Sequence, residues 1–480
     1  MSIRIVALYL LVAGLAVYAW KDWFKSLCGL ILLTAIVEHP DMPKTVLGIQ
    51  GLNPWNMLFA MIFVAWAAHR RRDELRWDMP RHLNVLLLLV LAVILIGWLR
   101  AAVDRSGLED YSFARLISDD LINTIKWTLP GVLLFDGCRT RRRVIMALVS
   151  IIGVYFIIAI QLHRLLPMSS ILQGGDSISY TRGSCKGMGY AATDLAVMLA
   201  GASWGLLAIM PLFRRKCRIV ILIAAGIMVT ALALTGGRAG YIAWGATGLV
   251  LCLMKWRRYL VLAPVVAVLL PMVFPGAVGR MLSGVGQTDV TGRTSVDEYA
   301  VTSGRNLIWP PVIDKIAASP LVGYGREAMI RTGVTAYLLM KYGESDSVPH
   351  PHNIYLETLL ENGVIGSLPI FLLWGVIVLY STRLFQSDNR LYSAAGGLAL
   401  AMILTSLTGG ISGQHYYPQA HTLGLWAAAF LMFRVYLEAQ RGQAAETSDF
   451  CLWNGQPERD RATCGSWRQP AVSSRNMWTV

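Results

Sequence analysis

Residues 349–366 read P-H-P-H-N-I-Y-L-E-T-L-L-E-N-G-V-I-G, and the rest of the chain is organised around this stretch. It places His350 and His352 in a short loop, continues as a segment typical of a helix, and then reaches paired glycines that open a long apolar segment. It follows the only long polar excursion of an otherwise hydrophobic sequence. The stretch therefore predicts a polar loop that delivers a histidine to the edge of a membrane.

The composition around this stretch is typical of a membrane protein. Of the 480 residues, 55% are hydrophobic and only 15% are charged, against about 25% charged in an ordinary soluble domain. Apolar runs recur, and a helix needs about 20 residues to cross the hydrocarbon core. The formal charge of +14 follows from the positive-inside rule, and no nucleic-acid module appears. We therefore expect an all-α polytopic membrane protein surrounded by lipid.

Apolar runs predict about twelve transmembrane helices, or thirteen if both parts of the first hairpin cross. Two crossings there would place the N-terminus outside, and one crossing would place it inside. Basic connections at 70–81, 139–143, 214–218 and 255–258 should be cytoplasmic. The expected spans are 3–20, 27–37, 54–68, 83–99, 121–135, 144–162, 188–213, 219–234, 239–254, 259–274, 363–381, 391–407 and 421–437.

This pattern divides the chain into four parts. We expect an N-terminal transmembrane bundle at 1–274, an external cap loop at 275–353, further spans at 354–437, and a disordered cytoplasmic tail at 438–480, which is polar and lacks apolar periodicity. The cap loop carries seven basic and seven acidic residues, so it is not a general anion-attracting surface. Within it we expect helices at 306–318 and 335–342, and a tight turn at Gly323-Tyr324-Gly325.

Two arginines stand out because of their positions. Arg238, in L-T-G-G-R-A-G-Y, lies between two apolar runs, where an arginine is costly unless it faces water, a partner or a ligand. Interfacial snorkelling is the simpler alternative, but the two glycines before it allow close backbone approach and favour an anion site. Arg305, in T-S-G-R-N-L-I-W, should begin the first cap helix. A helix residue that is simply solvated is an equally good interpretation of Arg305 taken alone.

The histidine pair has three interpretations. A loop histidine is often bonded to a neighbouring backbone group. His350 and His352 form a His-x-His pair that could bind a metal with Glu357 or His415, although no further Cys or His cluster supports that site. A histidine with its ordinary pKa near 6.5 is also suited to remove a proton at neutral pH. Asn353, directly after His352, is a good helix N-cap.

Three motifs between residues 235 and 366 resemble those of the O-antigen ligase and polymerase superfamily. They are Thr235-x-x-Arg238 at a span end, Ser303-Gly304-Arg305 with Trp309 followed by Pro320-Leu321-x-Gly323-x-Gly325, and His352-Asn353 with Gly363-x-x-Gly366. The resemblance implies a membrane glycosyltransferase that joins a glycan linked to undecaprenyl diphosphate to an acceptor. It places the cap and the active site in the periplasm, outside the bacterial inner membrane. It also implies a reaction without metal or cofactor, with His352, Arg238 and Arg305 as the essential residues.

The chain departs from the family pattern at two places. Between residues 180 and 195, where the family tends to show Arg-x-x-Gly and an Asn pair, it has Arg182, Gly183, Lys186 and Thr193-Asp194. The last external loop carries Gln414 and His415 where ligases often have an acidic residue. We expect five residues to bind substrate: Arg182, Lys186, Tyr324, Asn353 and His415.

The resemblance favours an O-antigen ligase that transfers polysaccharide to lipid A–core oligosaccharide. The alternatives in the same superfamily are an O-antigen polymerase and a protein O-oligosaccharyltransferase. A metal-dependent glycosyltransferase would use Glu109-Asp110 or Asp119-Asp120 as ligands, although such pairs are more often helix caps. A lipid-linked glycan flippase predicts charges at mid-membrane and internal repeats, but Lys126 and Asp194 are the main charges within the expected spans.

Overall fold

The computed structural model describes residues 3–46, 49–166, 177–282, 287–288, 294–295, 297–342, 348–413 and 417–453. Within these ranges the architecture is helical, as predicted. The strands there form two short antiparallel pairs, Thr45–Val46 (β1) with Ile49–Gln50 (β2) and Gln287–Thr288 (β3) with Thr294–Ser295 (β4).

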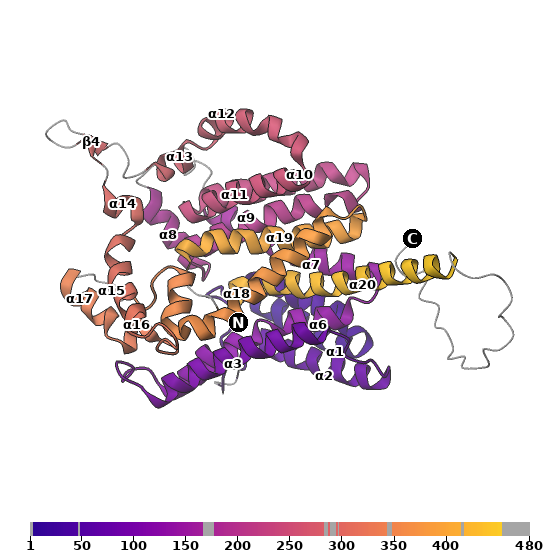
Figure 1. Cartoon of the computed structure of the whole chain (residues 1–480), viewed down its shortest axis with the longest axis horizontal. Coiled ribbons are helices and arrows are strands. Elements are labelled where there is room, and N and C mark those ends of the chain that lie inside the picture. The colour runs from indigo at the N-terminus through magenta and orange to yellow at the C-terminus, as the bar shows by residue number, and fades with distance from the viewer. Residues whose placement is uncertain are drawn as a thin grey trace.

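The α-helices form a bundle with a group of shorter helices at one end. Figure 1 shows the long helices side by side, with α14 to α17, here called the cap helices, gathered at one end and the last turns of α20 at the other. In chain order the helices are α1 (Ile3–Leu33), α2 (Pro54–Arg72), α3 (Arg81–Val103), α4 (Phe113–Ile117), α5 (Asn123–Lys126), α6 (Leu129–Gly137), α7 (Arg141–Leu165), α8 (Ser177–Gly187), α9 (Ala192–Ile209), α10 (Arg215–Leu234), α11 (Arg238–Met254), α12 (Ala263–Val273), α13 (Pro275–Met281), α14 (Glu298–Thr302), α15 (Arg305–Ala318), α16 (Ala328–Arg331), α17 (Val334–Tyr342), α18 (Ile354–Gln386), α19 (Arg390–Gly409) and α20 (Leu423–Trp453).

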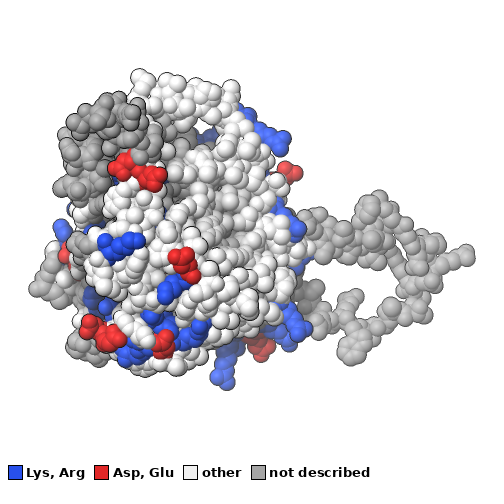
Figure 2. All heavy atoms as spheres, turned by 60° about the vertical axis from the view of Figure 1, so that its left-hand side comes forward, with Lys and Arg blue, Asp and Glu red and all other residues white. Residues whose placement is uncertain are grey.

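The helices confirm a multi-pass membrane protein but not the expected number of spans. In the described part of the chain, eight helices are long and apolar enough to cross a membrane, or nine if the pair bent by 100° at Phe274 is one span. The expected span 121–135 is divided among a π-helical turn, α5 and α6, and α11 has only 17 residues. The count of about twelve is therefore not confirmed. The face in Figure 2 is largely white over the bundle, and charged side chains lie mainly toward its margins.

The first hairpin of the sequence is one α1 segment that reverses direction. Asp22 has non-helical backbone angles (φ −150°, ψ 85°). The Ser26 hydroxyl donates a hydrogen bond of 2.8 Å to the Leu15 carbonyl, which lies on the other side of this break. The two halves of α1 therefore pack against each other. At the other end of the chain α20 continues to Trp453, past the expected end of the last span at 437, and residues 454–480 lie outside the described range.

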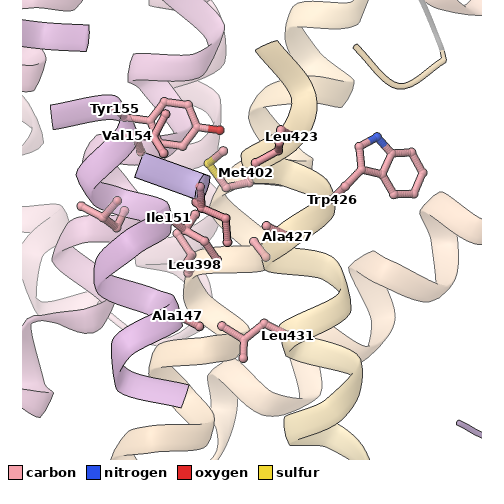
Figure 3. Packing of buried hydrophobic residues seen from close by; sticks show 14 of the residues in the cluster. Ala147, Ile151, Val154, Tyr155, Leu398, Met402, Leu423, Trp426, Ala427 and Leu431 are labelled. Carbon is pink, nitrogen blue, oxygen red and sulfur yellow. The ribbon is translucent and has the colours of Figure 1, made fainter. Parts of the chain in front are cut away.

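The core extends through the bundle, from α1, α2 and α6 to α7, α9, α18, α19 and α20. Figure 3 shows side chains of α7, α19 and α20 meeting there, including Ile151, Leu398 and Ala427. Small residues bring α9 and α19 close together, because a Cβ on Gly205 would lie 2.4 Å from Leu398 Cδ1 and a Cβ on Gly201 would lie 2.6 Å from Thr405 Oγ1. Close packing of small residues is a main source of helix association in membranes.

A buried ion network ties α20 to the connection between α2 and α3. The Arg434 side chain is fully buried, and its Nη1 and Nη2 donate to Asp78 over 2.8 and 2.6 Å. Its Nε donates to the Phe135 carbonyl over 2.6 Å. A buried arginine is tolerated only when its charge is paired and its donors are used. This pairing fixes α20, α6 and the α2–α3 connection relative to one another.

Candidate active site

A break in α18 organises the site. Gly363 has φ 59° and ψ −170°, a conformation open almost only to glycine. The break removes the backbone N–H groups that follow it from the helical hydrogen-bond ladder. Val364 N instead donates to Pro320 O over 2.8 Å, and Ile365 N donates to Leu321 O over 3.0 Å. The segment after α15 thus supplies the bonds that the helix lacks.

The carbonyls freed on the other side of the break are paired in the same way. Tyr324 N donates to Leu360 O over 2.9 Å, and Gly325 N donates to Glu361 O over 2.6 Å. A Cβ on Gly323 would lie 2.6 Å from Gly363 N, so the two backbones touch. The P-L-x-G-x-G motif and Gly363 therefore form one structural unit.

This unit corrects one expectation from the sequence. Residues 320–322 form the turn, whereas residues 323–325 run alongside α18 and do not form the predicted tight turn. The reason is the pairing with α18, which draws these residues away from local bonding. Helix α3 holds the other side, since Arg100 donates to the carbonyls of Val322 and Gly323 over 2.7 and 2.8 Å.

The histidine loop lies directly before α18. Asn353 caps the helix as predicted, because its Oδ1 accepts from the backbone N–H groups of Tyr355 and Leu356 over 3.0 and 3.1 Å. His352 has φ 51°, in the left-handed region. The ring centroids of His350 and His352 are 4.3 Å apart with the planes at 78°. Trp309 Nε1 of α15 donates to Pro351 O over 3.1 Å, which attaches the loop to the first long cap helix.

The two arginines meet at the turn that opens α15. Arg238 is the first residue of α11, and its Nη2 donates to Ser303 Oγ over 2.5 Å. Ser303 and Gly304 both have positive φ, of 55° and 79°, and Arg305 then begins α15 as expected. Arg305 Nη1 donates to Thr302 O over 2.9 Å. The structure therefore places Arg238 and Arg305 at the same turn, although 67 positions of sequence separate them.

The residues expected to bind substrate lie in different places. Tyr324 is half-buried and its hydroxyl donates to the Lys315 carbonyl over 3.1 Å. Lys186 is exposed in the last turn of α8. The side chain of Arg182 and the whole of His415 lie outside the described part of the chain. The structure thus connects Asn353 to the histidine loop but does not test a binding role for any of these residues.

The sequence did not single out a buried charged cluster beside the histidine loop. Arg326 is 5% exposed and Asp120 is 4% exposed. Arg326 Nε and Nη2 donate to Asp120 Oδ1 over 3.1 and 2.9 Å, and Nη1 lies 3.8 Å from Glu361 Oε2. Its guanidinium stacks on the Tyr417 ring. The sequence signals were the position of Arg326 directly after the P-L-x-G-x-G motif and the Asp119-Asp120 pair, which was considered there only as a metal ligand or helix cap.

The cluster alters the protonation of a neighbouring carboxyl group. Burial raises the pKa of Glu327 to about 8, and the charges of Asp120 and Glu361 act in the same direction against the opposing effect of Arg326. Its own backbone N–H donates to Glu361 Oε1 over 3.0 Å. The raised pKa favours the protonated form of Glu327, in which the carboxyl group can donate a hydrogen bond.

Asp119 and Asp120, one of the two pairs considered as metal ligands, are engaged in ion pairs. Asp120 accepts from Arg326 and, over 3.1 Å, from the Tyr111 hydroxyl, while Asp119 lies 3.4 Å from Arg115 Nε. Among the described residues, no group of three or more His, Cys, Asp or Glu side chains is arranged to hold a metal ion. The geometry of Asp119-Asp120 thus fits ion pairing with arginines.

The fold and the site together define a multi-pass membrane protein with two arginines and a histidine loop attached to one set of cap helices. Residues 223–372 match the family model described as O-Antigen ligase, and this region contains Arg238, Arg305, His352 and Gly363. This region is therefore similar to the O-antigen ligase superfamily, a glycosyltransferase-like group, as its motifs predicted. No match was found among curated proteins.

Proposed function

We propose that the protein is an O-antigen ligase that transfers polysaccharide from undecaprenyl diphosphate to lipid A–core oligosaccharide at the periplasmic face of the inner membrane. The observation that carries this proposal is the hydrogen bond of 2.5 Å between Arg238 Nη2 and Ser303 Oγ. It joins α11 to the turn that begins α15 at Arg305, and α15 is bonded through Trp309 to the loop of His352. Three groups with suitable chemistry therefore share one connected scaffold.

In the proposed reaction an acceptor hydroxyl attacks the anomeric carbon of the donor glycan. The new bond joins the hydroxyl oxygen to that carbon, and the bond from the carbon to the diphosphate oxygen breaks. His352 accepts the hydroxyl proton. Arg238 and Arg305 bind the departing undecaprenyl diphosphate, because planar guanidinium groups pair bidentately with phosphate oxygens. Stabilising the charge that develops on a leaving group often accounts for most of the rate enhancement in such reactions.

The start of α18 favours this use of His352. The first N–H groups of a helix lack intrahelical partners and carry partial positive charge. Asn353 satisfies two of them with its side chain. The remaining field disfavours protonation of the adjacent imidazole and attracts an anion. A neutral His352 can then act as a base while the same field helps to hold the donor diphosphate. Arg182, Lys186, Tyr324, Asn353 and His415 are proposed to contribute to substrate binding.

The ligase reaction is distinguished from its alternatives by the lipid that accumulates when the gene is deleted. Loss of a ligase leaves lipid-linked polymer together with unmodified core oligosaccharide. Loss of a polymerase leaves glycan of a single repeat, and loss of a protein O-oligosaccharyltransferase leaves an unglycosylated protein acceptor. A flippase would show no transfer by the purified protein. If one of these last three results were observed, the corresponding alternative would take the place of the proposed ligase reaction.

Substitution of Arg305 tests its assigned role. If Arg305 binds diphosphate as a bidentate fork, both Arg305→Ala and Arg305→Lys should lose most transfer activity, because a lysine point charge does not reproduce the fork geometry. The measurement is transfer by purified variants at matched concentration. Lys315→Ala, which removes a different basic side chain from α15, should retain activity. Near-complete activity of Arg305→Lys would show that Arg305 only begins α15 and does not bind the diphosphate as a fork.

Cysteine labelling tests the proposed orientation. Met340, in α17, is 81% exposed, and Asp73 is exposed after α2. In a background without Cys217, Cys451 and Cys464, a cysteine at position 340 should react with an impermeant thiol reagent in cells whose outer membrane is permeabilised. A cysteine at position 73 should react only after the inner membrane is broken. The reverse pattern would place the cap helices in the cytoplasm.

A further inference from the structure

A cleft of about 670 Å³ lies beside the histidine loop. Its walls come from the segment between α3 and α6, the start of α9, the region of α16, the start of α18 and the connection before α20. His350 lines the cleft, and its ring lies against that of His352. Arg238 and Arg305 are not among the lining residues. The cleft is therefore next to the proposed base but separate from the proposed diphosphate-binding arginines.

The charge of the cleft is unsuited to a diphosphate. Among the described lining residues the arginines are Arg115 and Arg326, and each faces a carboxylate at 3.4 and 2.9 Å. With Glu327 and the buried Glu357 left aside, the carboxylates are still more numerous: Glu38, Asp119, Asp120, Asp194 and Glu361. A diphosphate in the cleft would be repelled by these carboxylates, and the repulsion is stronger where water is partly excluded. An anionic donor group is therefore expected to stay on the side of Arg238 and Arg305.

The same lining is suited to a sugar without phosphate. Carboxylate oxygens accept hydrogen bonds from hydroxyl or amine groups, and these charge-assisted bonds are stronger than neutral ones. Glu327, with its raised pKa, adds a donor. Trp127 and Tyr190 are buried and form part of the apolar wall behind the cleft. Concave sites with apolar walls and a few convergent polar groups are the usual form of a small-ligand site.

We propose that this cleft binds the acceptor glycan through a sugar residue that is neutral or amine-bearing and carries no phosphate. This assignment rests on the proposed transfer reaction. It places the acceptor hydroxyl on the His350 side of the loop and the donor diphosphate on the arginine side, with His352 between the two substrates. The buried pair of Arg326 and Asp120 shapes one wall, and Asp194 and Asp119 reach the sugar.

The test uses the full-length protein in lipid nanodiscs and two variants that keep side-chain shape. The probe is deacylated, dephosphorylated core oligosaccharide, and its binding is measured by ligand-observed NMR and by the acceptor KM for transfer. Asp194→Asn and Asp119→Asn should each weaken binding and raise the acceptor KM about tenfold, as expected for loss of a hydrogen bond to a charged group. The donor KM should not change. Asp110→Asn removes an exposed carboxylate of the same connection that does not line the cleft, and it should behave as the wild type.

Several outcomes would overturn the assignment. They are wild-type affinity of both aspartate variants for the probe, tighter binding of phosphorylated core than of dephosphorylated core, and failure of the wild type to bind any glycan. Thermal unfolding of the variants separates loss of binding from loss of fold. If O-antigen repeat oligosaccharide binds in the cleft and core oligosaccharide does not, the cleft remains the acceptor site, but the ligase reaction is replaced by polymerisation.

Discussion

His352→Ala is expected to lower glycan transfer by about 10²-fold or more, the usual cost of losing general-base catalysis, while binding of the lipid-linked donor is largely kept. The position of the imidazole supports this result. His352 has a left-handed backbone (φ 51°), directly before the capping residue of α18. Trp309 of α15 holds the preceding carbonyl at Pro351. The residue is thus fixed between the arginine-bearing turn and the helix N-terminus.

His350→Ala provides the matched comparison. Pro351 separates the two histidines and restrains the turn, so that they cannot easily exchange places although their rings meet edge to face. His350 lines the proposed acceptor cleft, and its loss should cost far less than that of His352. Two measurements on purified protein are needed, namely the transfer rate and the binding of a labelled lipid-linked donor. If His352→Ala abolished donor binding together with transfer, the histidine would be a structural or phosphate-binding group and not the base.

Gly363→Ala is expected to prevent correct folding of the protein. Alanine is strained at φ 59° and ψ −170°, which costs about 1–3 kcal/mol alone. The added Cβ would also lie 2.3 Å from the Leu321 carbonyl carbon, so the paired backbone would have to separate. Separation would disrupt four backbone hydrogen bonds, two before Gly363 and two after it, and would leave buried polar groups without partners. We expect little monodisperse protein after extraction, and a large fall in its unfolding temperature.

Gly375→Ala is the control within the same helix. A Cβ at Gly375 would meet no atom within 4 Å. Alanine favours a helix over glycine by about 1 kcal/mol, so this variant should be as stable as the wild type or slightly more so. The measurement is thermal unfolding followed by size-exclusion chromatography in detergent. Wild-type stability of Gly363→Ala would show that α18 can run straight and that the cap segment does not depend on the break.

Local features of the site could be predicted from the sequence because they depend on neighbouring residues. Asn353 was expected to cap α18, and Arg305 was expected to begin α15, and both do so. The cap helix at 335–342 is found as α17. The order of the motifs likewise indicated the superfamily. Caps and amphipathic periods act within one or two helical turns, so their effects can be derived from the residue pattern.

Features that depend on distant pairing could not be predicted in this way. Arg326 and Asp120 are 206 positions apart. In the sequence, Arg326 is one of the seven basic residues of a neutral loop, and Asp120 belongs to the Asp119-Asp120 pair. Only the fold shows that the two side chains form an ion pair. The apolar run at 121–135 has the composition of a span, but its helix is interrupted at Trp127 and Thr128. Similarly, the turn expected at 323–325 was displaced because α18 offers unpaired backbone groups there.

The pairing around Gly363 also defines what can be exchanged between related proteins. Since the bonds between 320–325 and 360–365 are made by backbone atoms, most side chains there are free to vary without loss of the contact. The cap helices still cannot be transplanted alone, because the contact also requires the side chain of Arg100 and a glycine at position 363. A chimera that imports residues 297–342 must also import the matching start of α18 and the end of α3, where Gly97 and Arg100 bind the same segment. The interchangeable module is therefore discontinuous in the gene, and grafting experiments should be designed with three exchanged pieces.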